Sequence, residues 1–182
     1  MNEKNDIIMT MGKELIGNKV LSIRYMDETM YRDVWQNSLD ENNRRFVPDE
    51  VFETLEDTKE VVDQIINCYQ SKDGPFIYAV FRKEDEKNIG YVQLVKIDIG
   101  WEIGYHIAKA YNGFGYATES VRLFLDYLKQ NHVLKEIYGI ALADNKASIR
   151  VLEKNGFEFL FKGIDNYQGS PRKIVRYIKR LY

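Results

Sequence analysis

The stretch GYHIAKAYNGFGYATE, residues 104–119, decides the fold of this chain. Its first half alternates in the manner of a strand, and from Tyr116 the apolar side chains follow helical spacing to about residue 130. Gly113 and Gly115 lie two residues apart in the turn between strand and helix. Glycines at such a junction let several backbone N–H groups point at one spot, where the helix dipole adds partial positive charge. The turn therefore predicts an anion site with phosphate as its expected occupant, while tight strand–helix packing stays an alternative reason for the glycines.

The segments on either side of this turn predict a mixed sheet. Before it, residues 76–81, 89–97 and 101–107 read as three antiparallel strands in a meander. Gly90, inside the second strand, suggests a bulge or a close approach of two backbones. After the turn, the helix and an apolar strand at 136–142 complete a strand–helix–strand crossover, which joins parallel strands.

The rest of the chain is expected to add further elements to one domain spanning residues 1–182. Residues 1–18 are predicted to form a loose N-terminal arm or a short first helix, and the polar segment 37–46 is predicted to be irregular. Helices are also predicted at 28–37, 55–70 and 145–155, and strands at 20–24, 157–161 and 173–180. The expected fold class is α/β (α+β), with about seven strands.

Composition and charge exclude several classes of function. The 182 residues carry a formal net charge of −2, which argues against a broad nucleic-acid-binding face. Cys68 is the single cysteine, so no intrachain disulfide forms, as is usual in a reducing compartment. No apolar run is long enough to span a membrane, and residues 1–12 lack the apolar core of a secretory signal. We therefore expect a cytoplasmic protein without nucleic-acid or membrane partners, and the two histidines suggest no metal site.

Several short motifs occur in order around and after the turn. They are Glu102-Ile-Gly-Tyr, Asn112-Gly-Phe-Gly-Tyr-Ala117, Ala117-Thr-Glu119, Asn145-x-x-Ser148 and Asn155-Gly-Phe157. Together they resemble the GNAT superfamily of acetyl-CoA-dependent N-acetyltransferases, in the branch that includes the ribosomal-protein N-terminal acetyltransferases (RimJ/RimL-like). The resemblance covers nearly the whole chain and implies a GNAT-like mixed, twisted central sheet flanked by helices. Asn112 departs from it, because the family motif Gln/Arg-x-x-Gly-x-Gly/Ala begins with Gln or Arg.

The resemblance implies acetyl-CoA (coenzyme A) as the cosubstrate and assigns residues to it. The pantetheine arm would lie along the strand end at His106 and Ile107, where this strand splays from residues 140–142. Asn145 resembles the family asparagine that hydrogen-bonds the pantetheine, and a plain N-cap role is compatible with that contact. Ser148 shares its helical face and belongs to the same predicted site. The pyrophosphate would be held by the turn itself, at Asn112, Gly113, Phe114, Gly115, Tyr116 and Ala117.

The implied reaction transfers an acetyl group directly to an amine, which must be neutral to attack. Glu102 precedes the cofactor-facing end of its strand and is the candidate general base, with an ion-paired or substrate-orienting role as the alternative. Ser148 is the candidate general acid for the leaving thiolate, with a packing or capping role as the alternative. Leu152 stands one turn further along, where many family members have a tyrosine.

The acceptor site is expected to be formed mainly by the first half of the chain and by the loop around residue 167. The acceptor is predicted to be an amine, either a protein or peptide N-terminus or a small molecule such as a polyamine or an aminoglycoside. A non-catalytic acyl-CoA-binding or sensing domain of the same fold is the alternative function. Both a monomer and a homodimer agree with the sequence. The predicted acceptor-site residues are Tyr31, Trp35, Arg45, Phe46 and Tyr105.

Overall fold

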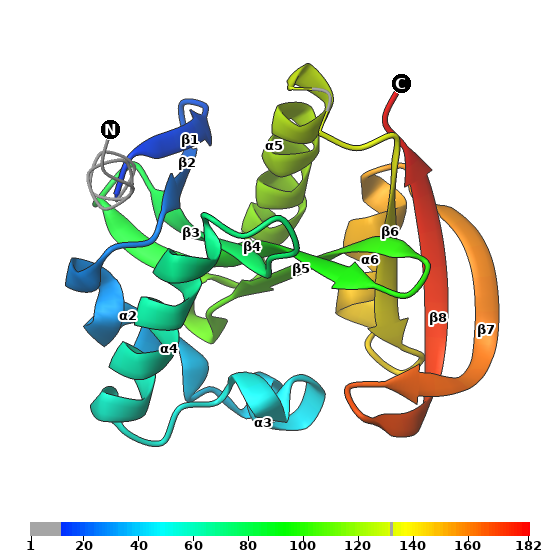
Figure 1. Ribbon diagram of the computed structural model, residues 1–182, viewed down its shortest axis with the longest axis horizontal. Helices are drawn as coiled ribbons and strands as arrows, with labels where there is room; N and C mark the ends of the chain where they lie inside the picture. The colour runs from blue at the N-terminus through cyan, green and yellow to red at the C-terminus, as the bar shows by residue number, and fades with distance from the viewer. Residues whose placement is uncertain (1–11, 132) are drawn as a thin grey trace.

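One eight-stranded sheet runs through the residues that the computed structural model describes, which are 12–131 and 133–182. Its strands follow the order β1-β2-β3-β4-β5-β6-β8-β7 (Figure 1). The strands are β1 (Glu14–Gly17), β2 (Leu21–Tyr25), β3 (Phe76–Arg82), β4 (Lys87–Ile97), β5 (Gly100–Ile107), β6 (Glu136–Leu142), β7 (Glu158–Tyr167) and β8 (Ser170–Arg180). The α-helices are α2 (Tyr31–Ser38), α3 (Glu41–Phe46), α4 (Leu55–Cys68), α5 (Tyr116–Gln130) and α6 (Lys146–Lys154), with 3₁₀ turns η1 (Glu28–Met30), η2 (Pro48–Glu50) and η3 (Lys109–Tyr111).

The sheet divides between β5 and β6. The other neighbouring strands pair antiparallel over several residues, whereas β5 and β6 run parallel and share one register pair, Glu102 with Tyr138, within the described ranges. Residues 103–107 of β5 and 139–142 of β6 therefore have no ladder partner in each other. This arrangement confirms the predicted crossover with parallel strands and the predicted splay at the end of β5.

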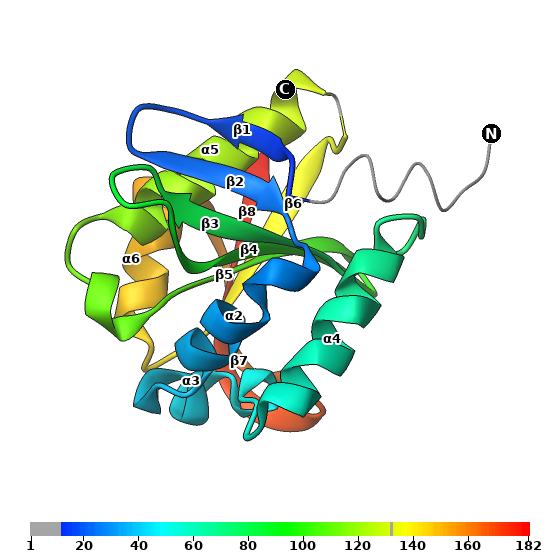
Figure 2. The same cartoon turned by 90° about the vertical axis from the view of Figure 1, so that its left-hand side faces the viewer.

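Helices cover both faces of the sheet (Figures 1 and 2). On one face α5 contributes Val121 and Phe124 to the larger apolar core, in which Ile103 of β5 is also buried. On the opposite face α4 contributes Val62 and Ile65 to a second core near α2. Strand β5 thus packs against the helical layer of α5 through Ile103, and its C-terminal end runs into the turn that starts α5.

The elements that carry long apolar periodicity have the predicted positions. Helix α5 and strand β6 match the expected bounds, and α4 ends two residues before the expected Gln70. Gly90 lies at a bulge in the β3–β4 ladder, and a Cβ added there would approach the His106 carbonyl oxygen to 2.0 Å. The prediction of a bulge or close backbone approach is therefore confirmed.

Three predictions are corrected by the structure. Residues 14–17, expected within an arm or helix, form the edge strand β1, while residues 1–11 of that arm lie outside the described part of the chain. The segment expected to be irregular contains α3, whose N-cap Asp40 accepts a hydrogen bond from the Asn43 amide at 2.9 Å. The last two strands are longer than predicted and meet in a turn at residues 168–169. None of the helices described is long and apolar enough to cross a membrane.

Candidate active site

The glycine turn has an open backbone surface at the start of α5. Gly113 has φ 87° and Gly115, the N-cap of α5, has φ 83°, a conformation that favours glycine. A Cβ added at either residue would meet no atom within 4 Å. Among the residues described, none supplies a hydrogen-bond acceptor for the backbone N–H groups of residues 113–117. These donors and the helix dipole make the turn suited to an anion.

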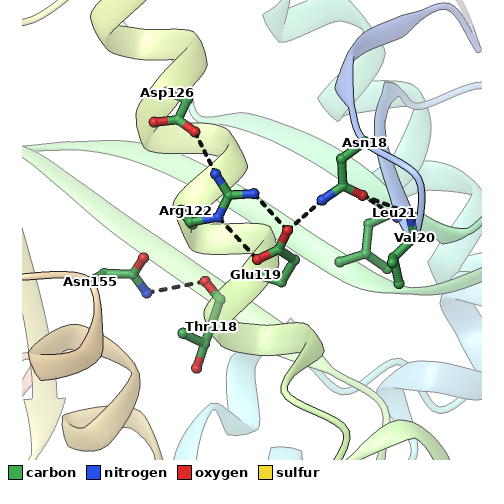
Figure 3. Close-up of polar contacts among 8 residues, drawn as sticks. All are labelled: Asn18, Val20, Leu21, Thr118, Glu119, Arg122, Asp126 and Asn155. Carbon is green, nitrogen blue, oxygen red and sulfur yellow. Dashed lines mark hydrogen bonds and ion pairs between the residues drawn. The ribbon is translucent and has the colours of Figure 1, made fainter.

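The first turn of α5 is fixed by polar contacts to two other segments (Figure 3). Asn18, before β2, donates its amide to Glu119, and Arg122 pairs with the same carboxylate at 2.7 Å. The Arg122 hydrogen bond, opposed by partial burial, holds the pKa of Glu119 below its ordinary value. On the other side, Asn155 donates to the Thr118 carbonyl at 3.2 Å. The glycine turn is therefore held between the β1–β2 turn and the end of α6.

A cleft of about 960 Å³ runs along the splay between β5 and β6. Its lining includes Asn112 and Ala117 of the glycine turn, and both sides of the splay along 102–107 and 140–142. It also includes Tyr167 of β7, so the predicted part of the loop around residue 167 belongs to the lining. One continuous space thus joins the glycine turn to the polar side chains at the start of β5.

Tyr105 connects the splayed strand to α6. Its hydroxyl donates to the Ser148 carbonyl at 2.9 Å and lies 2.9 Å from Ser148 Oγ. Burial raises the pKa of Tyr105, so the hydroxyl keeps its proton. Asn145 Oδ1 accepts the Ser148 backbone N–H at 3.1 Å, which confirms Asn145 as a helix cap. Its side-chain NH₂ group makes no hydrogen bond to the described residues and is available to a ligand in the cleft.

Glu102 lies at the point where the two strands separate. Burial raises its pKa to about 8, although a hydrogen bond from Tyr167, the charge of Arg176 and the backbone N–H of Ile140 act in the opposite direction. The Tyr167 hydroxyl donates to Glu102 Oε1 at 3.3 Å. A carboxyl group with a pKa of about 8 is mostly protonated at pH 7 and ionises slightly above neutral pH, within reach of proton transfer.

Strand alternation and the β4–β5 register place a second carboxyl group near Glu102. Gly104 shares the face of Glu102 and pairs with Gln93 of β4. The Gln93 amide lies so close over Gly104 that a Cβ added at this position would be 2.4 Å from it. Gln93 Nε2 donates to Glu50 Oε1 at 3.3 Å. Burial raises the pKa of Glu50, and the sequence interpretation missed this residue. Its sequence signal is its place in the first half of the chain, shortly after Arg45 and Phe46, which were predicted at the substrate site.

His106, predicted at the cofactor edge, lies at the end of β5 that has no ladder partner in β6, and its ring turns toward α3. His106 Nε2 lies 3.1 Å from Asp40 Oδ2, and the two side chains are 12% and 11% exposed. Burial alone would raise the pKa of Asp40, but the hydrogen bonds from His106 and from the Asn43 amide bring it below its ordinary value. Asp40 therefore caps α3 and also joins it to β5. Ile107 is buried in the larger core and lines the cleft.

The residues predicted to bind the amine substrate fall into three groups according to their position relative to the cleft. Phe46 and Tyr105 line the cleft, with Tyr105 on the side of α6. Arg45 forms an exposed ion pair with Asp144 at 2.8 Å, next to the cap of α6. Tyr31 turns away to bond Asp63 of α4, and Trp35 is absent from the described lining. The structure thus does not bring Tyr31 and Trp35 together with the other candidates.

Residues 21–158 match the acetyltransferase (GNAT) domain family, and this chain belongs to that family. A probable N-acetyltransferase of Bacillus subtilis, YjcK, is 37% identical over 109 residues, which are 58% of this chain and 56% of that relative. The match therefore spans about half the length of that relative.

Solved structures show the same fold. A GNAT-family acetyltransferase from Bacillus anthracis has a TM-score of 0.76 at 23% identity, over 91% of this chain and 97% of the other. RimL, a ribosomal L7/L12 alpha-N-protein acetyltransferase solved in complex with coenzyme A, has a TM-score of 0.78 at 18% identity, over 93% and 98% of the two chains. The sheet of the GNAT fold expected from the motifs is confirmed, with eight strands in place of about seven.

Proposed function

We propose that this chain transfers the acetyl group of acetyl-CoA to an amine. The observation that carries the proposal is the continuity of the cleft, which joins the free N–H groups at the start of α5 to the splayed edge of β5 and to Glu102. Acetyl-CoA would supply an acetyl group activated as a thioester. The sequence prediction of a cytoplasmic enzyme is retained as part of this proposal.

The residues at the glycine turn fit the phosphate groups of coenzyme A. The backbone N–H groups of residues 113–117 have no acceptor among the described residues, and the space above Gly113 and Gly115 is open. The backbone edge of β5 at Ile107, which has no ladder partner in β6, offers hydrogen-bonding groups to the amides of the pantetheine arm. Asn145 offers its side-chain NH₂ group from the opposite wall, beside Ser148.

Two sets of side chains would move protons on opposite faces of β5. Glu102 would accept the proton that the amine loses when the new C–N bond forms. Tyr105 Oη, held beside Ser148 Oγ, would give a proton to the sulfur when the C–S bond breaks. This arrangement gives the acid role to Tyr105 and Ser148 together, and it accounts for Leu152 at a position where many relatives have a tyrosine.

Binding and turnover test the proposal separately. We expect coenzyme A to raise the melting temperature of the protein, and acetyl-CoA with a panel of amines to release free thiol, detected with a thiol-reactive dye. Stabilisation by coenzyme A without thiol release for any amine would favour the non-catalytic alternative. Absence of stabilisation and of thiol release would exclude both functions.

A further inference from the structure

Asn43 carries an acceptor oxygen that has no donor. The residue is 1% exposed and lines the cleft. Its amide nitrogen donates to the Ser38 and Asn37 carbonyls at 3.2 Å and 3.4 Å, which fixes the orientation of the amide group. Asn43 Oδ1 is buried without a hydrogen-bond partner among the described residues. A buried acceptor of this kind is usually satisfied by a water molecule or by a bound ligand.

Glu50 carries a second buried acceptor oxygen that has no hydrogen-bond donor among the described residues. Gln93 occupies its Oε1, while Oε2 is buried and receives no hydrogen bond from the part of the chain that the structure describes. Glu50 and Asn43 line both the cleft and a smaller adjoining cavity of about 180 Å³. Apolar side chains make up much of the wall of that cavity, including Met26, Val34, Phe52, Val61 and Ile65. A carboxylate in these surroundings is costly unless a cation accompanies it.

The cationic side chains around the cleft form their ion pairs with carboxylates other than Glu50, although the charge of His106 also acts on Glu50. Among the lining residues described, Arg176 and His106 are the side chains able to carry positive charge. Arg176 pairs with Asp165 at 2.5 Å, and His106 pairs with Asp40 at 3.1 Å. The acidic lining residues outside these pairs are Asp49, Glu50, Asp98 and Glu102, and burial raises the pKa of Glu50 and of Glu102. A positively charged ligand at this end of the cleft would favour the ionised form of both carboxyl groups.

We propose that the acceptor is a small diamine, with its reacting amine at Glu102 and a second, protonated amine bound by Glu50 Oε2 and Asn43 Oδ1. This inference rests on the proposed acetyltransferase function and names its substrate class. Glu50 Oε2 and Asn43 Oδ1 are acceptors, and an ammonium group offers three donors and a positive charge. The unpaired donor Asn88 Nδ2 also lines the smaller cavity.

The spacing of the two carboxyl groups agrees with a short linker between the amines. Gln93, which holds Glu50, lies over Gly104, two residues from Glu102 on the same face of β5. Two residues of a strand span about 6.6 Å. A linear diamine with a four-carbon chain is therefore the probe of choice, with butylamine as the monoamine of the same chain length.

The test compares kcat/KM for these two amines in the wild type, Glu50→Gln and Glu53→Gln. We expect the wild type to prefer the diamine by about tenfold or more, and Glu50→Gln to lose most of this preference. Glu53→Gln is the matched control because Glu53 is exposed and pairs with Arg44 outside the cleft, so this variant keeps the preference. Unchanged stabilisation of Glu50→Gln by coenzyme A shows that the variant is folded.

The possible outcomes distinguish a failure of the diamine proposal from a failure of the proposed acetyltransferase function. Equal kcat/KM for the two amines in the wild type, or an unchanged preference in Glu50→Gln, would overturn the diamine proposal. A peptide N-terminus acetylated faster than the diamine would also overturn it, while leaving the acetyltransferase function intact. Failure of coenzyme A to bind and of every amine to release thiol would instead remove the function on which the proposal rests.

Discussion

The Tyr105 hydroxyl donates to the Ser148 carbonyl and lies 2.9 Å from Ser148 Oγ, so a side chain of β5 joins the first turn of α6. This contact crosses the region where β5 and β6 have no ladder pairs beyond Glu102 and Tyr138. The splay is therefore closed at one point by side chains, while the backbone edge of β5 stays free. The same contact places two hydroxyl groups on the wall of the cleft opposite the face of Glu102.

Replacing Tyr105 with Phe tests the proton donor. We expect kcat to fall by about tenfold to a hundredfold, because the leaving sulfur loses its proton source, while KM for acetyl-CoA changes little. Steady-state thiol release at saturating amine gives both constants. Tyr138→Phe is the control, since its hydroxyl bonds the exposed Glu136 away from α6, and it should keep the wild-type kcat. An unchanged kcat in Tyr105→Phe would show that the thiolate leaves without this donor.

The pH profile of the reaction tests Glu102 as the base. Burial raises the pKa of this carboxyl to about 8, and the base acts in its ionised form. We therefore expect kcat/KM, expressed per neutral amine, to rise with pH and to level off above about 8. Glu102→Gln should lose this inflection and about a hundredfold or more of the rate. If the inflection persists in the variant, the titrating group lies elsewhere.

The stability of Glu102→Gln gives an independent check of the same pKa. The folded-state pKa of about 8 lies above the ordinary value of 4.5, so the folded protein holds the proton more tightly than the unfolded chain. The stability gained from this group is fully present below pH 4.5 and is lost as pH rises through 8. Relative to the wild type, Glu102→Gln should become more stable by about 2 to 4 kcal/mol between pH 5 and pH 9. Urea unfolding at the two pH values measures the difference, and a constant difference would contradict the raised pKa.

The predictable parts of this fold are those with local signals. Helix α5 combines one-sided apolar spacing with a glycine start, and the predicted Asn145 cap bonds the Ser148 amide. Strand β1 has four residues, so its alternation is too short to separate from a helix or an arm. Helix α3 reads ENNRRF, which lacks an apolar stripe, and it is supported instead by Asp40, whose partner His106 is distant in sequence.

The difference between local sequence signals and contacts of distant residues also decides which parts of the candidate site are predictable. The glycine turn and Asn145 are recognisable because their function needs particular backbone positions close together in the chain. Glu50 is brought to the site by Gln93, and Gln93 fits there because Gly104 has no side chain. This arrangement depends on the β4–β5 register, which no short motif encodes. Tyr31 was a plausible wall residue by type, but its position in α2 directs it to Asp63.

Replacing Gly115 with Glu tests the anion site at the start of α5. A Cβ at this position would meet no protein atom within 4 Å, so crowding within the protein is not the reason to expect a defect. The carboxylate would instead place negative charge beside the N–H groups that we assign to the pyrophosphate. We expect affinity for coenzyme A, measured by calorimetry, to fall by about a hundredfold or more.

Gly169→Glu is the matched control for this variant, because both glycines have positive φ, at 83° and 74°, and neither would place a Cβ near another atom. Each replacement costs roughly 1–2 kcal/mol of backbone strain. The two variants should therefore lose similar stability, and Gly115→Glu alone should lose coenzyme A binding. Equal affinity for coenzyme A in the two variants would mean that the turn does not hold the phosphates. The free N–H groups of residues 113–117 would then need another ligand.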